Sequence, residues 1–303
     1  MMNQDFYNKL AEIVSAEAIL ENEPMSKHTT FRIGGNADVF VSPKVNQVAD
    51  VMKLAKEYQV PVTIIGNGSN LLVGDKGIRG LVLSFGKKAE EIVLDGRCMT
   101  VSAGTILAKV AAEAAKNSLT GLEFAAGIPG TMGGAIVMNA GAYGGEVKDV
   151  LISAKVLTPE GEVKELSNAE LDLSYRHSCI PEKNYIVLEA TLELMEGDEA
   201  VIREAMEDFK NRRVDKQPLE YPSAGSTFKR PEGHFAGKLI QDADLRGYQV
   251  GGAQVSEKHC GFVINKGDAT AKDVLQLISD VKKIVYEKFQ VELEPEVKMI
   301  GEF

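Results

Sequence analysis

The chain carries a dense run of glycine between Gly127 and Gly145. Seven of these nineteen residues are glycine, against 29 in the 303 residues of the whole chain. Each glycine loses much conformational freedom on folding, so such a run is expected only where backbone must pass close to something. A bound flat or phosphorylated ligand is one explanation, and a tightly packed glycine loop without a ligand is the other.

A second glycine segment, Gly66-Asn67-Gly68-Ser69-Asn70, directly follows a buried strand expected over Val60–Ile65. Successive N–H groups in such a turn can point into one concavity, which binds anions such as phosphate. A plain tight turn is the alternative. Leu71 stands where a Rossmann GxGxxG has its third glycine, and strand-like residues follow it, so that dinucleotide motif is excluded. Gly80–Lys88 lacks the spacing and the Ser or Thr of a P-loop.

Charge and composition exclude several classes of protein. With 34 basic and 44 acidic residues the net charge is −10, which argues against a nucleic-acid binder. Three widely spaced cysteines without a CxxC indicate reduced thiols, and four histidines without a ligand motif predict no metal site. The uncharged stretch Phe124–Gly145 has too many glycines, and a proline, to span a bilayer. We expect a cytoplasmic protein with no membrane, nucleic-acid or obligate protein partner.

Hydrophobic periodicity predicts an α+β fold. Helices are expected over residues 5–20, 46–58, 105–117, 199–216 and 272–289, and strands over 60–65, 81–85, 92–94, 99–102, 150–157, 162–166, 185–194 and 291–300. Composition changes near residue 197, where a charged helix leads into a second region. We therefore expect two domains, 1–197 and 198–303.

Three dispersed segments carry polar residues of chemical interest: Ser174–Ser178, Ala224–Lys229 and Leu293–Val297. Ser226 has neither a GxSxG elbow nor evident His and Asp partners, which argues against a hydrolase triad. Taken singly, Arg176 also fits a surface ion pair, and Glu296 a solvated strand residue.

Taken together, the segments resemble the UDP-N-acetylenolpyruvoylglucosamine reductase family, flavoenzymes that complete UDP-N-acetylmuramic acid for bacterial peptidoglycan, and hence serve cell shape and division. The resemblance covers nearly the whole chain, in the family's order, through Lys27–Gly35, Gly66–Asn70, Gly127–Gly134, Asn139–Glu146, Ser174–Ser178, Gly225–Lys229, Gln249–Ala253 and Leu293–Val297. One departure is the short interval from Arg176 to Ser226, which lacks the tyrosine-bearing loop of the enterobacterial form and indicates the second subtype.

The resemblance implies an FAD-binding domain of the vanillyl-alcohol-oxidase (PCMH) type with two α+β subdomains, followed by a smaller α/β substrate-binding domain. It implies FAD and NADPH as cofactors and a small UDP-sugar enolpyruvyl ether as substrate. The residues implied in FAD binding are Ile65, Gly66, Asn67, Gly68, Ser69, Asn70, Gly127, Gly133, Gly134, Asn139, Gly141 and Tyr143.

The implied reaction is a two-step hydride relay: NADPH reduces FAD, and the substrate then takes a hydride at C3. By resemblance, Arg176 clamps the substrate carboxylate, Glu296 is a second stabiliser that is protonated or shares a proton, and Ser226 protonates C2. Arg213, Lys216 and Gln249 match positions that hold the substrate's diphosphate or carboxylate.

Two other classes of protein are alternatives. An FAD-dependent oxidase of the same fold would use oxygen in place of NADPH, although no His or Cys stands where such enzymes attach flavin covalently. A non-catalytic nucleotide-binding protein would not need Ser226 and Glu296.

Overall fold

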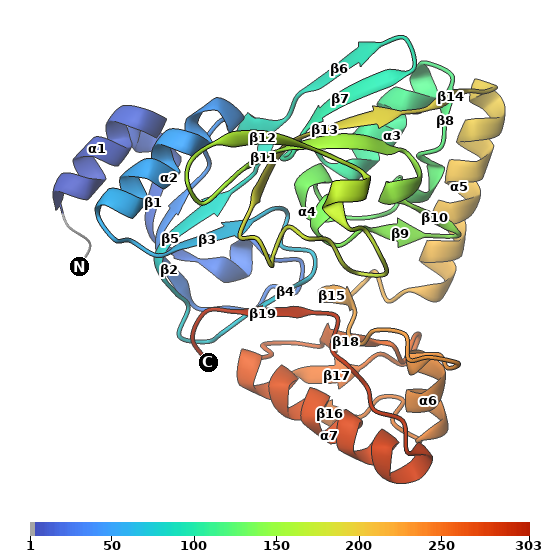
Figure 1. Cartoon of the computed structure of the whole chain (residues 1–303). Helices are drawn as coiled ribbons and strands as arrows, with labels where there is room; N and C mark the ends of the chain where they lie inside the picture. The colour runs from blue at the N-terminus through green and yellow to red at the C-terminus, as the bar shows by residue number, and fades with distance from the viewer. Residues whose placement is uncertain (1–3) are drawn as a thin grey trace. The chain divides into compact units, whose positions relative to one another are not determined.

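The structure, a computed structural model, describes residues 4–303, which form two compact units (Figure 1). The first unit holds the described residues up to Leu20, Val39–Asn67 and Gly80–Arg213. The second holds Glu21–Asp38, Gly68–Arg79 and Val214–Phe303.

The first unit contains an antiparallel five-stranded sheet of order β12-β11-β13-β7-β6 (Figure 1). Its strands are β6 (Ile92–Asp95), β7 (Cys98–Ser102), β11 (Leu151–Leu157), β12 (Val163–Ser167) and β13 (Ile186–Glu193). The helices are α1 (Gln4–Val14), α2 (Val48–Glu57), α3 (Leu107–Lys116), α4 (Met132–Val137) and most of α5 (Glu199–Lys216). Helix α4 packs on β13 and β7, so the glycine run lies against the sheet.

Among the described residues, eight further strands lie wholly or partly in this unit. They are β1 (Ile19–Pro24), β2 (Asn36–Val41), β3 (Val62–Ile65), β5 (Ile78–Ser84), β8 (Leu119–Thr120), β9 (Gly141–Ala142), β10 (Gly145–Glu146) and β14 (Met195–Glu196). Strands β1, β2, β5 and β3 form a sheet in that order, and β3 runs parallel to β5.

The second unit contains a four-stranded sheet of order β15-β18-β17-β16 and two helices. Its elements are β4 (Leu71–Val73), β15 (Ser223–Ser226), α6 (Ala236–Asp242), β16 (Gln249–Val250), β17 (Ala253–Val255), β18 (Phe262–Asn265), α7 (Ala271–Phe289) and β19 (Lys298–Ile300). Strand β19 runs parallel to β4, which places the C-terminal strand beside the segment that follows Gly68–Asn70.

Helix α7 shows how sequence fixes local structure in this unit. Its buried residues recur at helical spacing, for example Val274, Ile278 and Val281, and face the core of the unit. Thr270 caps the helix by accepting a hydrogen bond from the Asp273 N–H. The carboxylate of Asp75 accepts hydrogen bonds from two further N–H groups of the first turn, at 2.7 and 3.0 Å. These bonds connect the segment Gly68–Arg79 to α7.

The helices predicted over 46–58, 105–117, 199–216 and 272–289 are confirmed as α2, α3, α5 and α7. The predicted helix over 5–20 is wrong beyond Val14, because Ser15 adopts a left-handed φ of 69° and β1 begins at Ile19. The predicted strand over 291–300 is wrong before Lys298, where the chain forms only an isolated antiparallel bridge between Pro295 and Phe228. Helix α4, inside the glycine run, was not expected.

The two units differ from the expected division at residue 197. A single break in the chain was expected, whereas two internal segments, Glu21–Asp38 and Gly68–Arg79, join the C-terminal unit, and the division falls within α5. The contacts of Asp75 with α7 and of β4 with β19 account for this. None of the helices in residues 4–303 combines the length and the apolar character needed to cross a membrane.

Candidate active site

The loop Gly66–Asn70 lies between β3 and β4. Within residues 4–303, none of its five backbone N–H groups donates a hydrogen bond to the chain. Gly68 has a left-handed φ of +62°, as an anion-binding nest requires. Unpaired amides of this kind fit a phosphate group, which accepts several hydrogen bonds at once.

The glycines of this loop also have a reason within the chain itself. A Cβ on Gly68 would lie 2.1 Å from the His28 carbonyl oxygen, and a Cβ on Gly66 would lie 2.4 Å from Thr131 Oγ1. The His28 backbone therefore requires glycine at Gly68, and the Thr131 side chain leaves no room for a Cβ at Gly66. The unpaired amides, rather than the glycines, point to a ligand.

Two glycines of the glycine run have a packing reason, and a third has an open face. A Cβ on Gly133 would lie 3.0 Å from Ala103 Cβ, and one on Gly141 2.7 Å from the Gly145 carbonyl oxygen, so tight packing explains these two. A Cβ on Gly134 would meet only Thr131 Oγ1, at 3.6 Å. The face of α4 at Gly134 thus has room for a flat group.

Asn139 is completely buried, and its side chain is held by the protein. Its amide donates to Glu146 Oε2 at 2.7 Å and to the Ser174 carbonyl at 3.2 Å, and its Oδ1 accepts the Lys148 N–H at 3.0 Å. These contacts join the 139–148 loop to the turn that carries Arg176. The side chain organises this turn, and the backbone N–H of Asn139 donates to the Ile136 carbonyl at 3.1 Å. A contact of Asn139 with the cofactor stays a prediction.

Arg176 occupies a tight turn in which Ser174 and His177 exchange backbone hydrogen bonds of 3.3 and 3.1 Å. It adopts a left-handed φ of 55°, uncommon for a residue with a side chain. The guanidinium carbon lies 5.1 Å from the ring centre of Tyr175. A half-buried arginine fixed in this way is suited to clamp a planar carboxylate.

Arg213, Tyr143 and Gly127 meet in the first unit. A Cβ added at Gly127 would lie 3.3 Å from the Arg213 side chain. Burial lowers the pKa of the Arg213 guanidinium, and the electrostatic interaction with Tyr143 partly offsets this by raising it. The site therefore keeps a partly desolvated cation, which strengthens its attraction for an anionic ligand.

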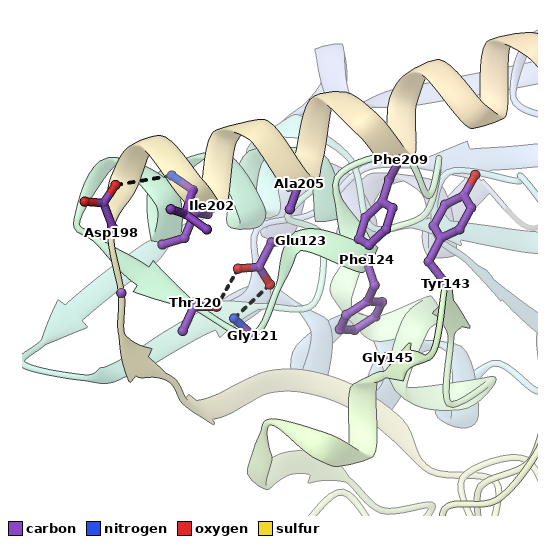
Figure 2. A pocket seen from close by; sticks show the side chains of 12 residues that line it. Thr120, Gly121, Glu123, Phe124, Tyr143, Gly145, Asp198, Ile202, Ala205 and Phe209 are labelled. Atoms are coloured by element: carbon purple, nitrogen blue, oxygen red, sulfur yellow. Dashed lines mark hydrogen bonds between the residues drawn. The ribbon is translucent and has the colours of Figure 1, made fainter.

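A cavity of about 480 Å³ adjoins Tyr143 and α5 (Figure 2). Tyr143 stacks on Phe209 with ring centres 4.6 Å apart, and Figure 2 shows the pair at one end of the lining. Glu123 is held at the wall by Thr120 Oγ1 at 2.6 Å and the Gly121 N–H at 2.9 Å. The stack fixes Tyr143 against the helix that carries Arg213.

The segments that carry Ser226 and Glu296 are hydrogen-bonded to each other in the second unit. Strand β15 ends at Ser226, which is exposed and whose hydroxyl makes no hydrogen bond within residues 4–303. The Glu296 N–H donates to the carbonyl of Thr227, the next residue, at 2.8 Å. The two predicted catalytic residues therefore lie on adjacent segments. Convergence of Arg176 with this pair stays a prediction.

Lys216 and Gln249, the other predicted substrate residues, are both exposed. Gln249 is oriented by its neighbours: its Nε2 donates to the Gly251 carbonyl at 2.9 Å, and its Oε1 accepts from Gln254 at 3.1 Å. These two hydrogen bonds fix the orientation of the Gln249 side-chain amide. The exposed ammonium group of Lys216 is accessible to an anionic ligand.

His259 is a candidate that the sequence analysis missed. It is half-buried, and its Nδ1 accepts the Gly261 N–H at 3.1 Å, while the Gly261 carbonyl accepts from Thr227 at 2.8 Å. Burial lowers the pKa of His259, and the charge of Lys216 lowers it further. A neutral imidazole with an Nε2–H therefore lies close to the Ser226 strand. Its sequence context, Lys258-His259-Cys260, gave no signal.

Comparisons with known proteins bear directly on this arrangement. Residues 37–167 match the family model described as "FAD binding domain", and residues 217–300 match "UDP-N-acetylenolpyruvoylglucosamine reductase, C-terminal domain". The UDP-N-acetylenolpyruvoylglucosamine reductase of Agathobacter rectalis is 60% identical over 314 residues, which cover 100% of each chain. That of Clostridium perfringens (strain 13) is 54% identical and covers 99% of each.

Comparison with solved structures gives the same family. The crystal structure of UDP-N-acetylenolpyruvylglucosamine reductase from Thermus caldophilus has a TM-score of 0.79 at 35% identity, over 93% of this chain and 97% of that one. The 4-ethylphenol oxidase of Gulosibacter chungangensis, 14% identical with a TM-score of 0.51, shares the fold alone.

These findings confirm the predicted fold class, an α+β chain with an FAD-binding domain of the vanillyl-alcohol-oxidase (PCMH) type. The C-terminal domain matches the model of the reductase family's own C-terminal domain. The match over the full chain and the FAD-binding domain show an FAD-binding oxidoreductase. The chain belongs to the UDP-N-acetylenolpyruvoylglucosamine reductase family.

Proposed function

We propose that this protein catalyses the NADPH-dependent reduction of UDP-N-acetylglucosamine enolpyruvate to UDP-N-acetylmuramate through bound FAD, in the cytoplasm, as a step of peptidoglycan synthesis. The observation that carries the proposal is that the segments of Ser226 and Glu296 are adjacent, joined by the hydrogen bond from the Glu296 N–H to the Thr227 carbonyl at 2.8 Å. A protein that only binds nucleotides has no need of this pair. Membership of the reductase family supports the same function.

The residues present fit FAD. The five unpaired N–H groups of Gly66–Asn70 supply donors for a diphosphate, and the open face of Gly134 has room for a flat ring. We propose that Ile65–Asn70, together with residues of the glycine run, hold the cofactor. These residues would hold FAD, and the bound cofactor would supply hydride transfer from NADPH to C3 of the enolpyruvyl group.

Arg176 and Glu296 are assigned to the substrate carboxylate. An enol ether is a poor hydride acceptor, so its adjacent carboxylate must be polarised and the enolate that forms must be stabilised. Arg176 offers a rigid fork of donors that matches both carboxylate oxygens. Glu296 is assigned as the second residue that stabilises the developing negative charge.

Ser226 is assigned the proton that C2 receives. A serine hydroxyl is a weak acid, so it transfers a proton only to a strongly basic carbon, and the enolate provides one. Its exposed position at the end of β15 leaves the hydroxyl accessible to substrate.

We assign the remaining anionic groups of the substrate to Arg213, Lys216 and Gln249. Within the described residues, the side-chain oxygens of Gln217 and Gln254 are buried without a hydrogen-bond partner. Gln217 follows Lys216 in the chain, and Gln254 contacts Gln249. These two side-chain oxygens can accept hydrogen bonds from a ligand that carries N–H or hydroxyl groups.

The two half-reactions test this function separately. NADPH should bleach the flavin in the absence of substrate, and substrate should restore its colour without oxygen. Arg176→Lys keeps the charge but loses the bidentate fork, so the substrate half-reaction should slow about 10- to 10²-fold while reduction by NADPH persists. Stopped-flow absorbance of the flavin measures both rates.

Arg212→Lys is the matched control, because Arg212 lies on α5 in an exposed ion pair with Asp208. It should leave both half-reactions unchanged. If Arg176→Lys slows both half-reactions equally, Arg176 supports the fold and does not bind the substrate carboxylate.

A further inference from the structure

The segment Lys27–Gly35 matches the family but contributes nothing to the chemistry assigned above. It lies in the second unit, together with Gly68–Arg79 and β15. Within this segment, Thr30 is half-buried. The contacts of this residue link two functional segments that are far apart in the chain.

Thr30 makes one hydrogen bond to each of these segments. Its backbone N–H donates to the Gly68 carbonyl at 3.3 Å, inside the loop with the unpaired amides. Its hydroxyl donates to the Ser223 carbonyl at 2.6 Å, at the start of β15. Ser226 ends the same short strand. One residue thus connects the cofactor loop to the strand of the proton donor.

Neighbouring contacts make this connection rigid. The His28 carbonyl lies so close to Gly68 that a Cβ there would be 2.1 Å from it. Phe31 is buried, and its carbonyl accepts from Asn265 Nδ2 at 3.3 Å, on the strand that pairs with β15. The segment is therefore packed against both of the elements that Thr30 joins.

Glu296 is tied to the same loop. Asn70 Nδ2 donates to the Glu296 carbonyl at 3.2 Å, and the Asn70 carbonyl accepts the Lys298 N–H at 2.9 Å. The Gly68–Asn70 end of the loop consequently positions both partners of the catalytic pair, Ser226 through Thr30 and Glu296 through Asn70.

We propose that Thr30 is a positioning residue, whose hydroxyl sets the register of β15 against the Gly68–Asn70 loop and thereby places Ser226 relative to the cofactor. This inference rests on the proposed function. Proton transfer depends steeply on the placement of the donor, and a misplacement of about 1 Å can cost about 10²-fold in rate. Loss of the Thr30 hydroxyl should therefore act on the substrate half-reaction selectively.

Three variants test the proposal. Thr30→Val has nearly the shape of threonine without its hydroxyl, and Thr30→Ser restores the hydroxyl. Thr29→Val is the matched control: Thr29 is buried, and its hydroxyl donates to Ile33 at 3.3 Å, a contact that stays inside the segment. For each variant, FAD affinity, thermal unfolding and both half-reaction rates are measured.

In Thr30→Val, reoxidation of the flavin by substrate should slow about 10- to 10²-fold, with FAD affinity and reduction by NADPH close to wild type. Thr30→Ser should recover most of the lost rate. Thr29→Val should leave the ratio of the two half-reaction rates unchanged. If Thr30→Val does not fold, Thr30→Ala at lower temperature provides the same comparison.

Wild-type rates in Thr30→Val, or an equal loss in both half-reactions that serine does not rescue, would overturn the role of Thr30 and leave the proposed function standing. A wild-type flavin that the enolpyruvyl substrate does not reoxidise would overturn the proposed function, and the role of Thr30 with it. The wild-type measurement distinguishes the two failures.

Discussion

In Ser226→Ala, NADPH bleaches the flavin at close to the wild-type rate, whereas reoxidation by the enolpyruvyl substrate slows about 10²–10⁴-fold, the usual contribution of a positioned general acid. This result is expected because the substitution removes only the hydroxyl. Ser226 is exposed and its hydroxyl makes no hydrogen bond within residues 4–303, so loss of the hydroxyl disturbs no hydrogen bond of the fold. Stopped-flow absorbance under anaerobic conditions measures both rates.

Ser223→Ala is the matched control for this prediction, since Ser223 lies on the same strand and contributes its carbonyl to Thr30. It should react normally in both steps. Ser226→Cys, with a more acidic side chain of similar reach, should recover part of the lost rate. An alanine variant that its substrate reoxidises at the wild-type rate would show that Ser226 is not the proton donor.

The second large effect is expected at the cofactor loop. Ser69→Asp places a carboxylate among the unpaired amides of Gly66–Asn70, where it should repel a diphosphate and occupy its donors. FAD affinity should fall about 10²-fold or more. Ser69→Asn, of nearly the same size but neutral, should bind FAD much as the wild type does. Titration of the apoprotein with FAD measures both.

Ser69 is a sharper probe than the neighbouring glycine. Gly68→Glu would also lose FAD, but any side chain there meets the His28 carbonyl, so the loss would not distinguish charge from a damaged loop. Thermal unfolding of the apoproteins should be alike for Ser69→Asp and Ser69→Asn. Equal FAD affinity in these two variants would contradict the assignment of the diphosphate to this loop.

Much of the local structure follows from the sequence. Helix α7 has a continuous apolar stripe and a capping Thr270, and such local signals determine a helix largely by themselves. The end of α1 at Val14 could not be predicted, because the apolar spacing continues through residues that the structure assigns to β1. Which segments belong to each of the two units could not be predicted either. Their assignment depends on contacts such as that of Asp75 with α7, almost two hundred residues away.

The candidate site could be predicted where short motifs carry it. Gly66–Asn70 and the segment around Ser226 stand out by residue type and order. The side-chain partners of Asn139, the placement of His259 beside the Ser226 strand and the bridge through Thr30 could not be predicted. Each depends on how distant segments meet, and no local pattern encodes that.

The most direct measurement is an anaerobic titration of the purified protein in two steps. NADPH should bleach the flavin with one equivalent per bound FAD, and UDP-N-acetylglucosamine enolpyruvate should then restore the full absorbance with formation of one equivalent of UDP-N-acetylmuramate. A colourless protein, or a reduced flavin that only oxygen reoxidises, would contradict the account.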